Sequence, residues 1–212
     1  MRTFQLKIKR LTDFLISSIC IVIALPFWVV IIFIIKVTMP GPVLFKQERI
    51  GKNFKPFQVL KFRTMKVDEE AEKNFTIEKD LERITPFGHF LRRSKLDETP
   101  QLINIWKGEM SLVGPRPTVR QRVQEFREGQ DVRLSMAPGL TGLSQVSGNV
   151  LLSWPRRIEY DCQYVQNFSL LLDINIILKT IIVVLFGEEK YISQEDLKSN
   201  RNPFYDITHK NS

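Results

Sequence analysis

The stretch FLISSICIVIALPFWVVIIFII, residues 14–35, decides how the rest of the chain can fold. It is 22 residues long and contains no charged side chain. A straight helix of that length measures about 33 Å, which is enough to cross the hydrocarbon core of a bilayer. The stretch is too long for a cleavable signal peptide, and no small-residue cleavage site follows it. We therefore expect a permanent membrane segment close to the N-terminus.

Pro26 lies near the middle of this segment, and basic residues stand on both of its sides. A proline inside a helix removes a backbone hydrogen bond and bends or breaks the helix, so Pro26 is the candidate membrane break. A spanning helix normally places only one basic flank in the cytoplasm, whereas two half-helices that enter and return keep both flanks there. The residues alone leave both topologies open. The basic residues are Arg2, Lys7, Lys9 and Arg10 before the segment, and Lys36, Lys46, Arg49, Lys52 and Lys55 after it.

The net charge of +8 is concentrated around the membrane segment. Residues 1–66 hold 12 lysines and arginines against 2 acidic residues. This distribution favours contact with anionic lipid head groups. Nucleic acid is the competing explanation of a high isoelectric point. The sequence has no recognition helix, zinc-ligand spacing or aromatic RNA-binding motif, so we expect no nucleic-acid partner.

The stretch VLFKQERIGKNFKPFQVLKFRTM, residues 43–65, predicts a β-hairpin. Two runs rich in Val, Phe, Ile and Leu flank a Gly-Lys-Asn turn, which is typical of antiparallel strands. The second run ends with Lys61, Arg63 and Thr64, a cluster of donors suited to phosphate oxygens. A solvated strand face is the alternative explanation for Lys61 or Arg63 alone.

Two adjacent carboxylates, Asp97 and Glu98, stand before a short predicted helix, QLINIWK. Thr99, followed by a proline, is expected to cap this helix, and Gly108 to end it. A helix N-terminus keeps a carboxylate ionised and also attracts phosphate. Helix capping is the alternative role for the acidic pair.

Arg116 is enclosed by two prolines and precedes a second helix expected over residues 117–127. The glycine-rich segment at residues 137–149 contains Gln145, a further candidate for substrate binding. Its glycine spacing matches neither the P-loop nor the dinucleotide fingerprint. On these residues alone the segment is only a weak signal of nucleotide or phosphate binding.

Two further helices are expected in the C-terminal part of the chain. Residues 154–167 form the first. Residues 168–187 are strongly apolar but are interrupted by Asp173, Asn175 and Lys179, which disfavours a spanning helix. An amphipathic helix at the membrane interface fits better, with a packed core helix as the alternative.

Taken together, the motifs resemble the bacterial sugar transferases. These are the monotopic polyprenyl-phosphate phosphoglycosyl transferases that start capsule, O-antigen and glycoprotein glycan assembly. The resemblance covers roughly residues 7 to 185, and the length matches the small catalytic form. Its pieces are KRLTDFL at 9–15, the proline-containing apolar run, and the segments at 41–65, 91–117, 138–149 and 160–180.

The resemblance implies an α+β fold, mostly helical, in three parts. Residues 1–40 would form a re-entrant membrane helix hairpin, residues 41–187 a membrane-associated catalytic domain, and residues 188–212 a polar tail. The implied location is the cytoplasmic face of the bacterial inner membrane. The implied reaction moves a phosphosugar from a UDP-sugar to polyprenyl (undecaprenyl) phosphate, with release of UMP. It uses Mg²⁺ and a covalent phosphosugar–enzyme intermediate, and the resemblance also allows a homodimer.

The same resemblance suggests roles for individual residues. Asp97 matches the nucleophile that attacks the sugar-linked phosphorus, and it would also contact Mg²⁺. Glu98 matches the second acid of the pair, as a base for the lipid phosphate or a supporting metal contact. The remaining candidates for phosphate or substrate binding are Lys61, Arg63, Arg92, Arg116 and Gln145.

This chain departs from many relatives at two positions of the glycine-rich segment. Ala137 and Asn149 occupy positions where many relatives have arginine. The departures concern contacts to nucleotide or sugar, not the phosphoryl chemistry. A second hypothesis is a non-catalytic, membrane-anchored interaction protein of a glycan assembly complex, which would need no acidic pair.

Overall fold

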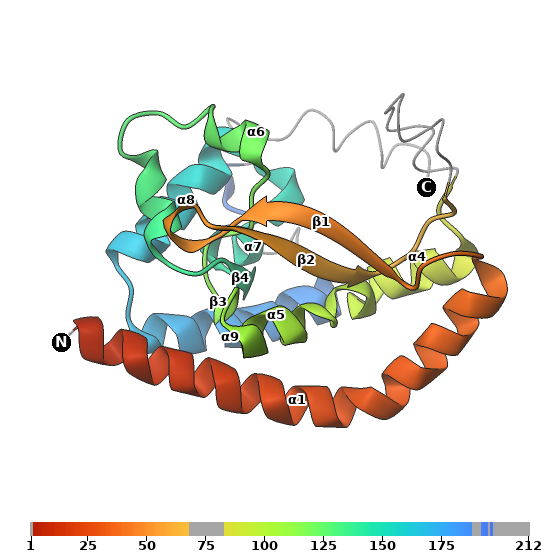
Figure 1. The fold of residues 1–212 in the computed structure, drawn as a ribbon. Helices are drawn as coiled ribbons and strands as arrows, with labels where there is room; N and C mark the ends of the chain where they lie inside the picture. The colour runs from red at the N-terminus through yellow and green to blue at the C-terminus, as the bar shows by residue number, and fades with distance from the viewer. Residues whose placement is uncertain (1, 68–82, 188–191, 195, 197–212) are drawn as a thin grey trace.

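The computed structural model describes residues 2–67, 83–187, 192–194 and 196 (Figure 1). As expected, the fold is α+β and mostly helical. Two small two-stranded sheets, β1–β2 antiparallel and β3–β4 parallel, lie among the helices. The described elements are α1 (Arg2–Thr38), β1 (Leu44–Ile50), η1 (Lys52–Phe54), β2 (Pro56–Phe62), α4 (Pro86–Arg93), η2 (Leu96–Glu98), α5 (Gln101–Lys107), β3 (Ser111–Val113), α6 (Arg120–Val123), η3 (Gln130–Ser135), β4 (Gly139–Thr141), α7 (Leu143–Val146), η4 (Asn149–Leu151), α8 (Trp154–Gln166) and α9 (Leu170–Phe186).

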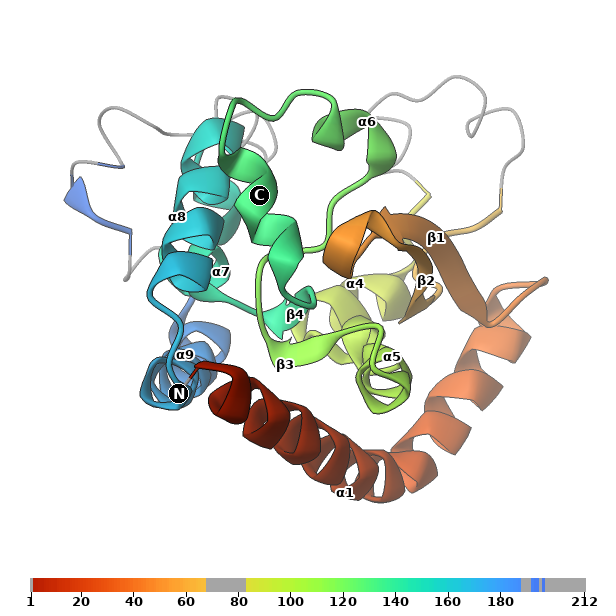
Figure 2. The ribbon, with the colours of Figure 1, turned by 60° about the vertical axis from the view of Figure 1, so that its left-hand side comes forward.

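Helix α1 is continuous through Pro26, so the expected break is a bend. Figures 1 and 2 show it as one bowed helix that runs beneath the rest of the molecule. The half after Pro26 packs against the domain through Trp28, Ile31 and Ile35, which are buried. The Trp28 indole N–H also donates to the Thr99 hydroxyl at 3.0 Å. These contacts stabilise the second half of the helix along the domain.

Polar side chains fix the N-terminal half of α1 to the same domain. Lys9 forms a buried ion pair with Asp173 of α9, with 2.6 Å between Nζ and Oδ2. Asp13 accepts hydrogen bonds from the Ser111 hydroxyl (2.7 Å) and the Leu112 N–H (3.0 Å) at β3. The charged residues before the apolar run therefore have a structural task, besides any contact with lipid.

The predicted β-hairpin is confirmed. β1 pairs with β2 in an antiparallel register that places Leu44 opposite Phe62. The connection turns through Asn53 and Phe54, whose φ angles of 53° and 61° lie in the left-handed region. This turn leaves Lys61 at the end of β2 that lies near the acidic pair.

One core joins the second half of α1 to the hairpin and to helices α4 and α5. Asn104 links α5 to β2: its amide oxygen accepts from the Leu60 N–H at 3.1 Å, and its amide nitrogen donates to the Gln58 carbonyl at 2.7 Å. The buried apolar residues of this core are Trp28, Ile31, Ile35, Met39, Phe57, Val59, Phe62, Leu91, Leu102, Ile105 and Met110.

The start of α5 differs from the expected one. Thr99 is not the N-cap, because its hydroxyl donates to the Leu96 carbonyl at 2.8 Å and accepts from Trp28. Asp97 and Glu98 instead lie inside a 3₁₀ turn, η2, which leads into α5. The end is as expected, with Gly108 at a φ of 87°.

Two other predicted segments have different bounds from the expected ones. The helix expected over residues 117–127 is only the single turn α6. The glycine-rich segment at 137–149 folds into β4, α7 and the start of η4 instead of an open loop. The helix expected over residues 154–167 is confirmed as α8.

Helix α9 buries one of the three polar residues that interrupt its apolar sequence, Asp173, whereas Asn175 and Lys179 are exposed. Asp173 points inward, where it meets Lys9 and accepts from the Tyr164 hydroxyl at 2.7 Å. Leu171, Ile174 and Leu178 lie on the exposed surface. The outward face of α9 is therefore largely apolar, as an interfacial helix requires.

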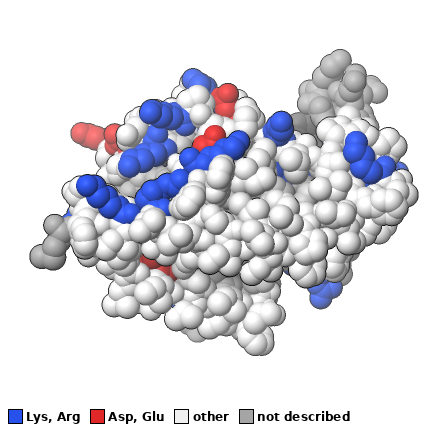
Figure 3. Space-filling view, turned by 60° about the horizontal axis from the view of Figure 1, so that its bottom comes forward, with Lys and Arg blue, Asp and Glu red and all other residues white. Residues whose placement is uncertain are grey.

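The two apolar helices contribute to one side of the molecule. Among the described residues, α1 alone is long and apolar enough to cross a membrane, and most of its apolar stretch is exposed. Figure 3, which turns the α1 side forward, shows a broad area without charged side chains and a band of Lys and Arg along one edge. A surface of this kind on a protein is the mark of an interface.

The predicted C-terminal tail is described only in part. Ile192 packs with Leu151 and Leu152, and Asp196 accepts hydrogen bonds from Tyr160 and Ser193. The rest of the tail lies outside the described residues. So does most of the polar segment at 66–83, which the sequence predicts as a surface helix with a loop.

Candidate functional site

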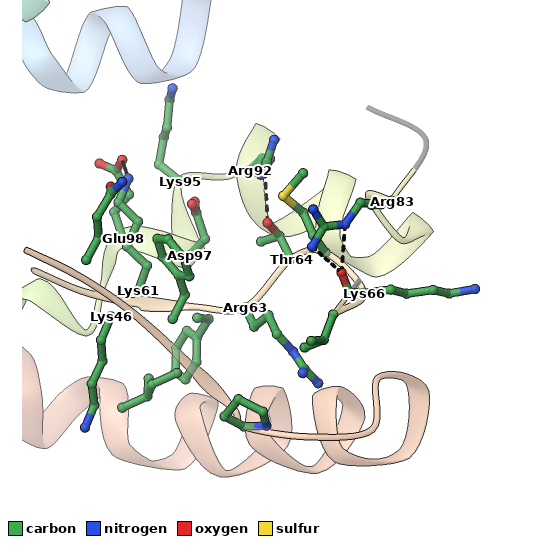
Figure 4. Close-up of a pocket in the computed structure, with 17 residues that line it drawn as sticks. Lys46, Lys61, Arg63, Thr64, Lys66, Arg83, Arg92, Lys95, Asp97 and Glu98 are labelled. Carbon is green, nitrogen blue, oxygen red and sulfur yellow. Dashed lines mark hydrogen bonds and ion pairs between the residues drawn. The ribbon is translucent and has the colours of Figure 1, made fainter. Parts of the chain in front are cut away.

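A pocket of about 890 Å³ lies between the β-hairpin, α4 and η2 (Figure 4). It contains five of the residues that the sequence singled out for chemistry. Its lining is Pro42, Leu44, Phe45, Lys46, Gln47, Lys61, Phe62, Arg63, Thr64, Met65, Lys66, Val67, Arg83, Arg92, Lys95, Asp97 and Glu98.

Asp97 is a buried carboxylate in the wall of this pocket, only 8% exposed. Within the part of the chain that the structure describes, its oxygens accept no hydrogen bond and form no ion pair. Burial and the charge of Glu98 raise the pKa of Asp97, while the nearby charges of Lys61, Arg92 and Lys95 oppose that rise. A carboxylate that is poorly solvated and unpaired is a stronger nucleophile than one in water.

Glu98 has the opposite electrostatic environment. Its carboxylate pairs with Lys61, with 2.5 Å between Nζ and Oε1. Burial alone would raise the pKa of Glu98, but Lys61, Arg116 and Lys95 lower it below its usual value. Glu98 is therefore held ionised, and the two adjacent acids have pKa values that are shifted apart.

Arg92, near the end of α4, lines the pocket beside the end of β2. Its Nε donates to the Thr64 hydroxyl at 2.9 Å, as Figure 4 shows. This contact depends on Gly88, where a β-carbon would stand 2.0 Å from the Thr64 carbonyl oxygen. The absence of a side chain at Gly88 lets α4 approach the end of β2, which brings Arg92 to the pocket.

Arg63 lines the pocket but is directed away from the acids, toward α1 (Figure 4). Its Nη2 donates to the Met39 carbonyl just after the end of α1. Burial lowers the pKa of Arg63. Its Nε and Nη1 have no hydrogen-bond partner among the described residues. These nitrogens are themselves buried, so in this structure the Arg63 guanidinium is held against the loop after α1 and not presented to the pocket.

Arg116 lies near Glu98 but outside the pocket lining. Its Nη1 donates to the Asn149 side-chain oxygen at 3.2 Å, and its charge lowers the pKa of Glu98. Arg49 of β1 is close to both residues: burial and the charge of Arg116 lower the pKa of Arg49, and Glu98 opposes this. Arg49 and Arg116 thus add positive charge near Glu98, which favours a further anion.

Gln145 does not join this group. Its side-chain nitrogen donates to the Leu140 carbonyl at 3.0 Å, and a β-carbon at Gly142 would stand 2.7 Å from its side-chain oxygen. Gln145 thus packs inside its own turn.

Sequence reasoning missed several residues at or beside the site. Lys95 was not singled out, and Arg49 was named only as one of the basic residues after the membrane segment. Asp161 and Arg133 contact the backbone of Arg116. Asp161 lies in a segment predicted only as a helix, and Arg133 lies in a segment for which no structure was predicted. Only the spatial arrangement identifies them, because no local pattern marks a residue whose partner is far away in the sequence.

The residues fit a divalent cation only together with a substrate. Among the described residues no group of three His, Cys, Asp or Glu side chains comes together. Mg²⁺ needs only one or two carboxylates when substrate phosphates and waters complete its ligands. The unpaired Asp97 next to Glu98 meets that requirement.

Comparison with known proteins gives consistent matches along most of the chain. The sequence profile described as bacterial sugar transferase matches residues 4–187. The UDP-glucose:undecaprenyl-phosphate glucose-1-phosphate transferase of Klebsiella pneumoniae is 38% identical over 191 residues, 86% of this chain and 41% of that protein. The undecaprenyl-phosphate galactose phosphotransferase of Salmonella typhimurium is 37% identical over 201 residues, 87% of this chain and 42% of that protein.

A shorter relative matches over nearly its whole length. The exopolysaccharide production protein ExoY of Rhizobium meliloti is 39% identical over 198 residues, which are 86% of this chain and 88% of that protein. The chain thus spans about two fifths of the Klebsiella and Salmonella proteins and most of the Rhizobium protein.

Proposed function

Because the chain belongs to the bacterial sugar transferase family, we propose that it transfers a phosphosugar from a UDP-sugar to polyprenyl phosphate. The observation that carries the proposal is the buried, unpaired Asp97 carboxylate, with Lys61 and Arg92 in the same pocket. Neutral ligands would not need these cations, whereas a diphosphate would. UDP-glucose and UDP-galactose are the first donors to test, since glucose and galactose occur in the names of the relatives.

The proposed chemistry has two displacements at one phosphorus atom. An Asp97 oxygen attacks the sugar-linked phosphorus, the bond to the bridging oxygen breaks, and UMP leaves with that bond's electron pair. The product is an aspartyl-phosphosugar. An oxygen of polyprenyl phosphate then attacks the same phosphorus and releases the Asp97 carboxylate. Covalent catalysis of this kind splits one transfer between two bulky partners into two simpler steps.

The surrounding side chains have separate tasks in this mechanism. Lys61 and Arg92 would bind the phosphoryl oxygens on which negative charge accumulates, and Arg116 would bind the leaving UMP phosphate. Glu98, held ionised by Lys61, orients that lysine. Glu98 and Asp97 would together hold a metal ion. Mg²⁺, when bound, would neutralise diphosphate charge and so favour departure of UMP.

The pocket lining suits a lipid phosphate as the acceptor. It combines charged side chains, Lys61, Asp97 and Glu98, with apolar residues that follow the end of α1, Pro42, Leu44 and Phe45. A polyprenyl chain could leave the bilayer beside α1 and lie along the apolar part. Its phosphate would then meet Lys61 and Arg92, which line the same pocket as Asp97.

The attachments of α1 support a re-entrant topology at the cytoplasmic face. Lys9, before the apolar run, and Met39, after it, both contact the same domain. A straight spanning helix would separate these ends by the bilayer thickness. The bend at Pro26 would then carry the exposed apolar middle of α1 into one leaflet, and the basic flanks would meet anionic lipid.

The decisive assay measures UMP release by the purified full chain in detergent. The reaction contains Mg²⁺, undecaprenyl phosphate and one UDP-sugar at a time, with Asp97→Asn as the paired variant. We expect UMP from wild type with at least one donor and almost none from Asp97→Asn. No release across a broad panel of UDP-sugars would favour the non-catalytic interaction protein, and equal release by both proteins would exclude Asp97 as nucleophile.

Topology has its own test. Single cysteines placed at residues 4 and 38, in a variant without Cys20 and Cys162, are labelled in intact cells with a membrane-impermeant maleimide. The re-entrant proposal predicts protection of both positions until the membrane is opened. Labelling of residue 4 alone from outside the cell would contradict it.

A further inference from the structure

Arg116 supplies the only backbone N–H group of the three-residue segment Pro115-Arg116-Pro117. Pro115 and Pro117 have no N–H group, and a residue before proline is restricted to extended conformations. The Arg116 N–H donates to Oδ2 of Asp161 on α8 at 3.2 Å. The carbonyl of Pro115 accepts from the Gly139 N–H at 2.9 Å.

The other side of the same residue is held by Arg133. Nη2 of Arg133 donates to the Arg116 carbonyl at 2.8 Å and also to Asp161. Asp161 therefore contacts the Arg116 N–H directly and the Arg116 carbonyl through Arg133. Ser144 of α7 completes the arrangement by donating to Oδ1 of Asp161 at 2.8 Å.

Burial makes this ion pair costly to keep for stability alone. Arg133 and Asp161 are 1% and 0% exposed. The Arg133 guanidinium lies beside the rings of Phe126 and Trp154, at 5.3 and 5.7 Å from their centroids. Its Nε and Nη1 have no hydrogen-bond partner among the described residues. A buried ion pair with unsatisfied donors is often no more stable than an apolar replacement, so another reason for its presence is needed.

The consequence of this arrangement is the direction of the Arg116 side chain. With its backbone fixed on both sides, the side chain extends to Asn149 and lies close enough to Glu98 to lower the pKa of that residue. Asn149 is itself buried and has a φ of 44°. Four segments that are distant in sequence thus converge on one arginine beside the pocket.

We propose that Asp161 and Arg133 are positioning residues, which fix the backbone of Arg116 so that its guanidinium meets the phosphates of the UDP-sugar. Neither residue touches substrate. The inference rests on the proposed function, because it assigns Arg116 to the nucleotide phosphate. It goes further because it makes binding of the UDP-sugar depend on the buried Arg133–Asp161 ion pair, which does not line the pocket.

The test compares two isosteric variants on the same side of the molecule. Asp161→Asn removes the charge that holds Arg133 and Arg116. Asp196→Asn is the matched control, because Asp196 is equally buried and pairs with Arg156 of α8 but does not contact Arg116. We expect Asp161→Asn to lower kcat/KM for the UDP-sugar about tenfold, mainly through KM, and the control to stay within about twofold of wild type.

A double-mutant cycle separates positioning from general damage. In an Arg116→Ala background, Asp161→Asn should change kcat/KM by less than about twofold, because its effect acts through the side chain already removed. Wild-type kcat/KM for Asp161→Asn, or the same tenfold loss in both backgrounds, would overturn the proposal. If Asp161→Asn gives no folded protein, Ser144→Ala replaces it in the same cycle and is judged by the same outcomes.

Hydrogen exchange supplies a readout that does not need activity. Peptides covering residues 112–120 should exchange faster in Asp161→Asn than in wild type and Asp196→Asn, because asparagine has one acceptor oxygen where Asp161 uses two for the Arg116 amide, Arg133 and Ser144. Unchanged exchange would contradict the proposed contact. A wild-type protein that releases no UMP would contradict the proposed function alone, whereas an active wild type with an equally active Asp161→Asn would contradict the positioning pair alone.

Discussion

Asp97 and Asp161 are both buried carboxylates, at 8% and 0% exposure, but their surroundings are opposite. Asp161 accepts hydrogen bonds from Arg133, Ser144 and the backbone of Arg116. Asp97 accepts none among the described residues. Burying an unpaired carboxylate costs free energy, so a chain retains one only where it has another use.

The same contrast divides the buried aspartates of the described residues into two groups. Asp13, Asp161 and Asp173 each accept two or more hydrogen bonds and join segments that are distant in sequence. Asp97 lies beside cations that do not pair with it. The first three aspartates stabilise the fold, and Asp97 is left available for chemistry. Substitutions at these residues test this division.

Asp97→Asn should have the largest effect on activity and almost none on stability. We expect UMP release to fall by at least about 10³-fold, because an amide cannot act as the nucleophile. The melting temperature should stay equal or rise, since the change removes a buried, unpaired charge. The two measurements are a UMP assay and thermal unfolding in the same detergent. A large loss of stability would show that Asp97 stabilises the fold as Asp161 does, and would contradict the proposed difference between the two residues.

Asp173→Asn should show the opposite pattern. The substitution retains an acceptor for the Tyr164 hydroxyl but leaves Lys9 buried without its partner. Breaking such a buried pair is expected to cost about 3 kcal/mol in the free energy of unfolding, which denaturant titration measures. The double variant Lys9→Met/Asp173→Leu should recover most of that loss. Equal losses in the single and double variants would show that the ion pair is not the cause.

Arg92→Lys should lower activity, whereas the same change at the neighbouring Arg93 should not. Lysine retains the charge but loses the planar guanidinium that reaches Thr64, so we expect kcat/KM to fall about tenfold. Arg93→Lys is the matched control on the same helix, since Arg93 is exposed and lies outside the pocket lining. Similar losses in both variants would indicate an effect of α4 as a whole.

Asp196→Asn should give the smallest effect, and one that depends on pH. Burial alone would raise the pKa of Asp196, but hydrogen bonds from Tyr160, Ser193 and Arg156 lower it below its ordinary value. A lowered pKa contributes stability above the unfolded-state value of about 3.9, and that contribution disappears as the pH falls through the folded-state value. Unfolding curves of wild type and variant should therefore converge at acid pH. A gap that widens toward acid pH would contradict the assigned direction.

Much of the fold could be predicted because its signals are local. The apolar run at 14–35, the hairpin turn near Asn53 and the stop at Gly108 each depend on neighbouring residues. The start of α5 was predicted wrongly, because Trp28 and the Leu96 carbonyl engage the Thr99 hydroxyl. Trp28 is 71 positions away from Thr99, so the residues around Thr99 could not predict this contact.

The site could be predicted only as far as it is encoded in short motifs. Lys61, Arg92, Asp97 and Glu98 were expected to act together, and the fold brings them into one pocket. Arg133 was not expected, because its partners come from elements far apart in the chain. The direction of Arg63, away from the acids, depends on the loop after α1 and could not be inferred from the strand pattern.

The most direct test of the central claim is to trap the intermediate. The full-length protein is incubated with its UDP-sugar donor and Mg²⁺ but without polyprenyl phosphate, and its peptides are then analysed by mass spectrometry. The account predicts one equivalent of UMP and a phosphosugar attached to Asp97, lost when undecaprenyl phosphate is added and absent from Asp97→Asn. UMP release that requires the acceptor, with no adduct on Asp97, would contradict it.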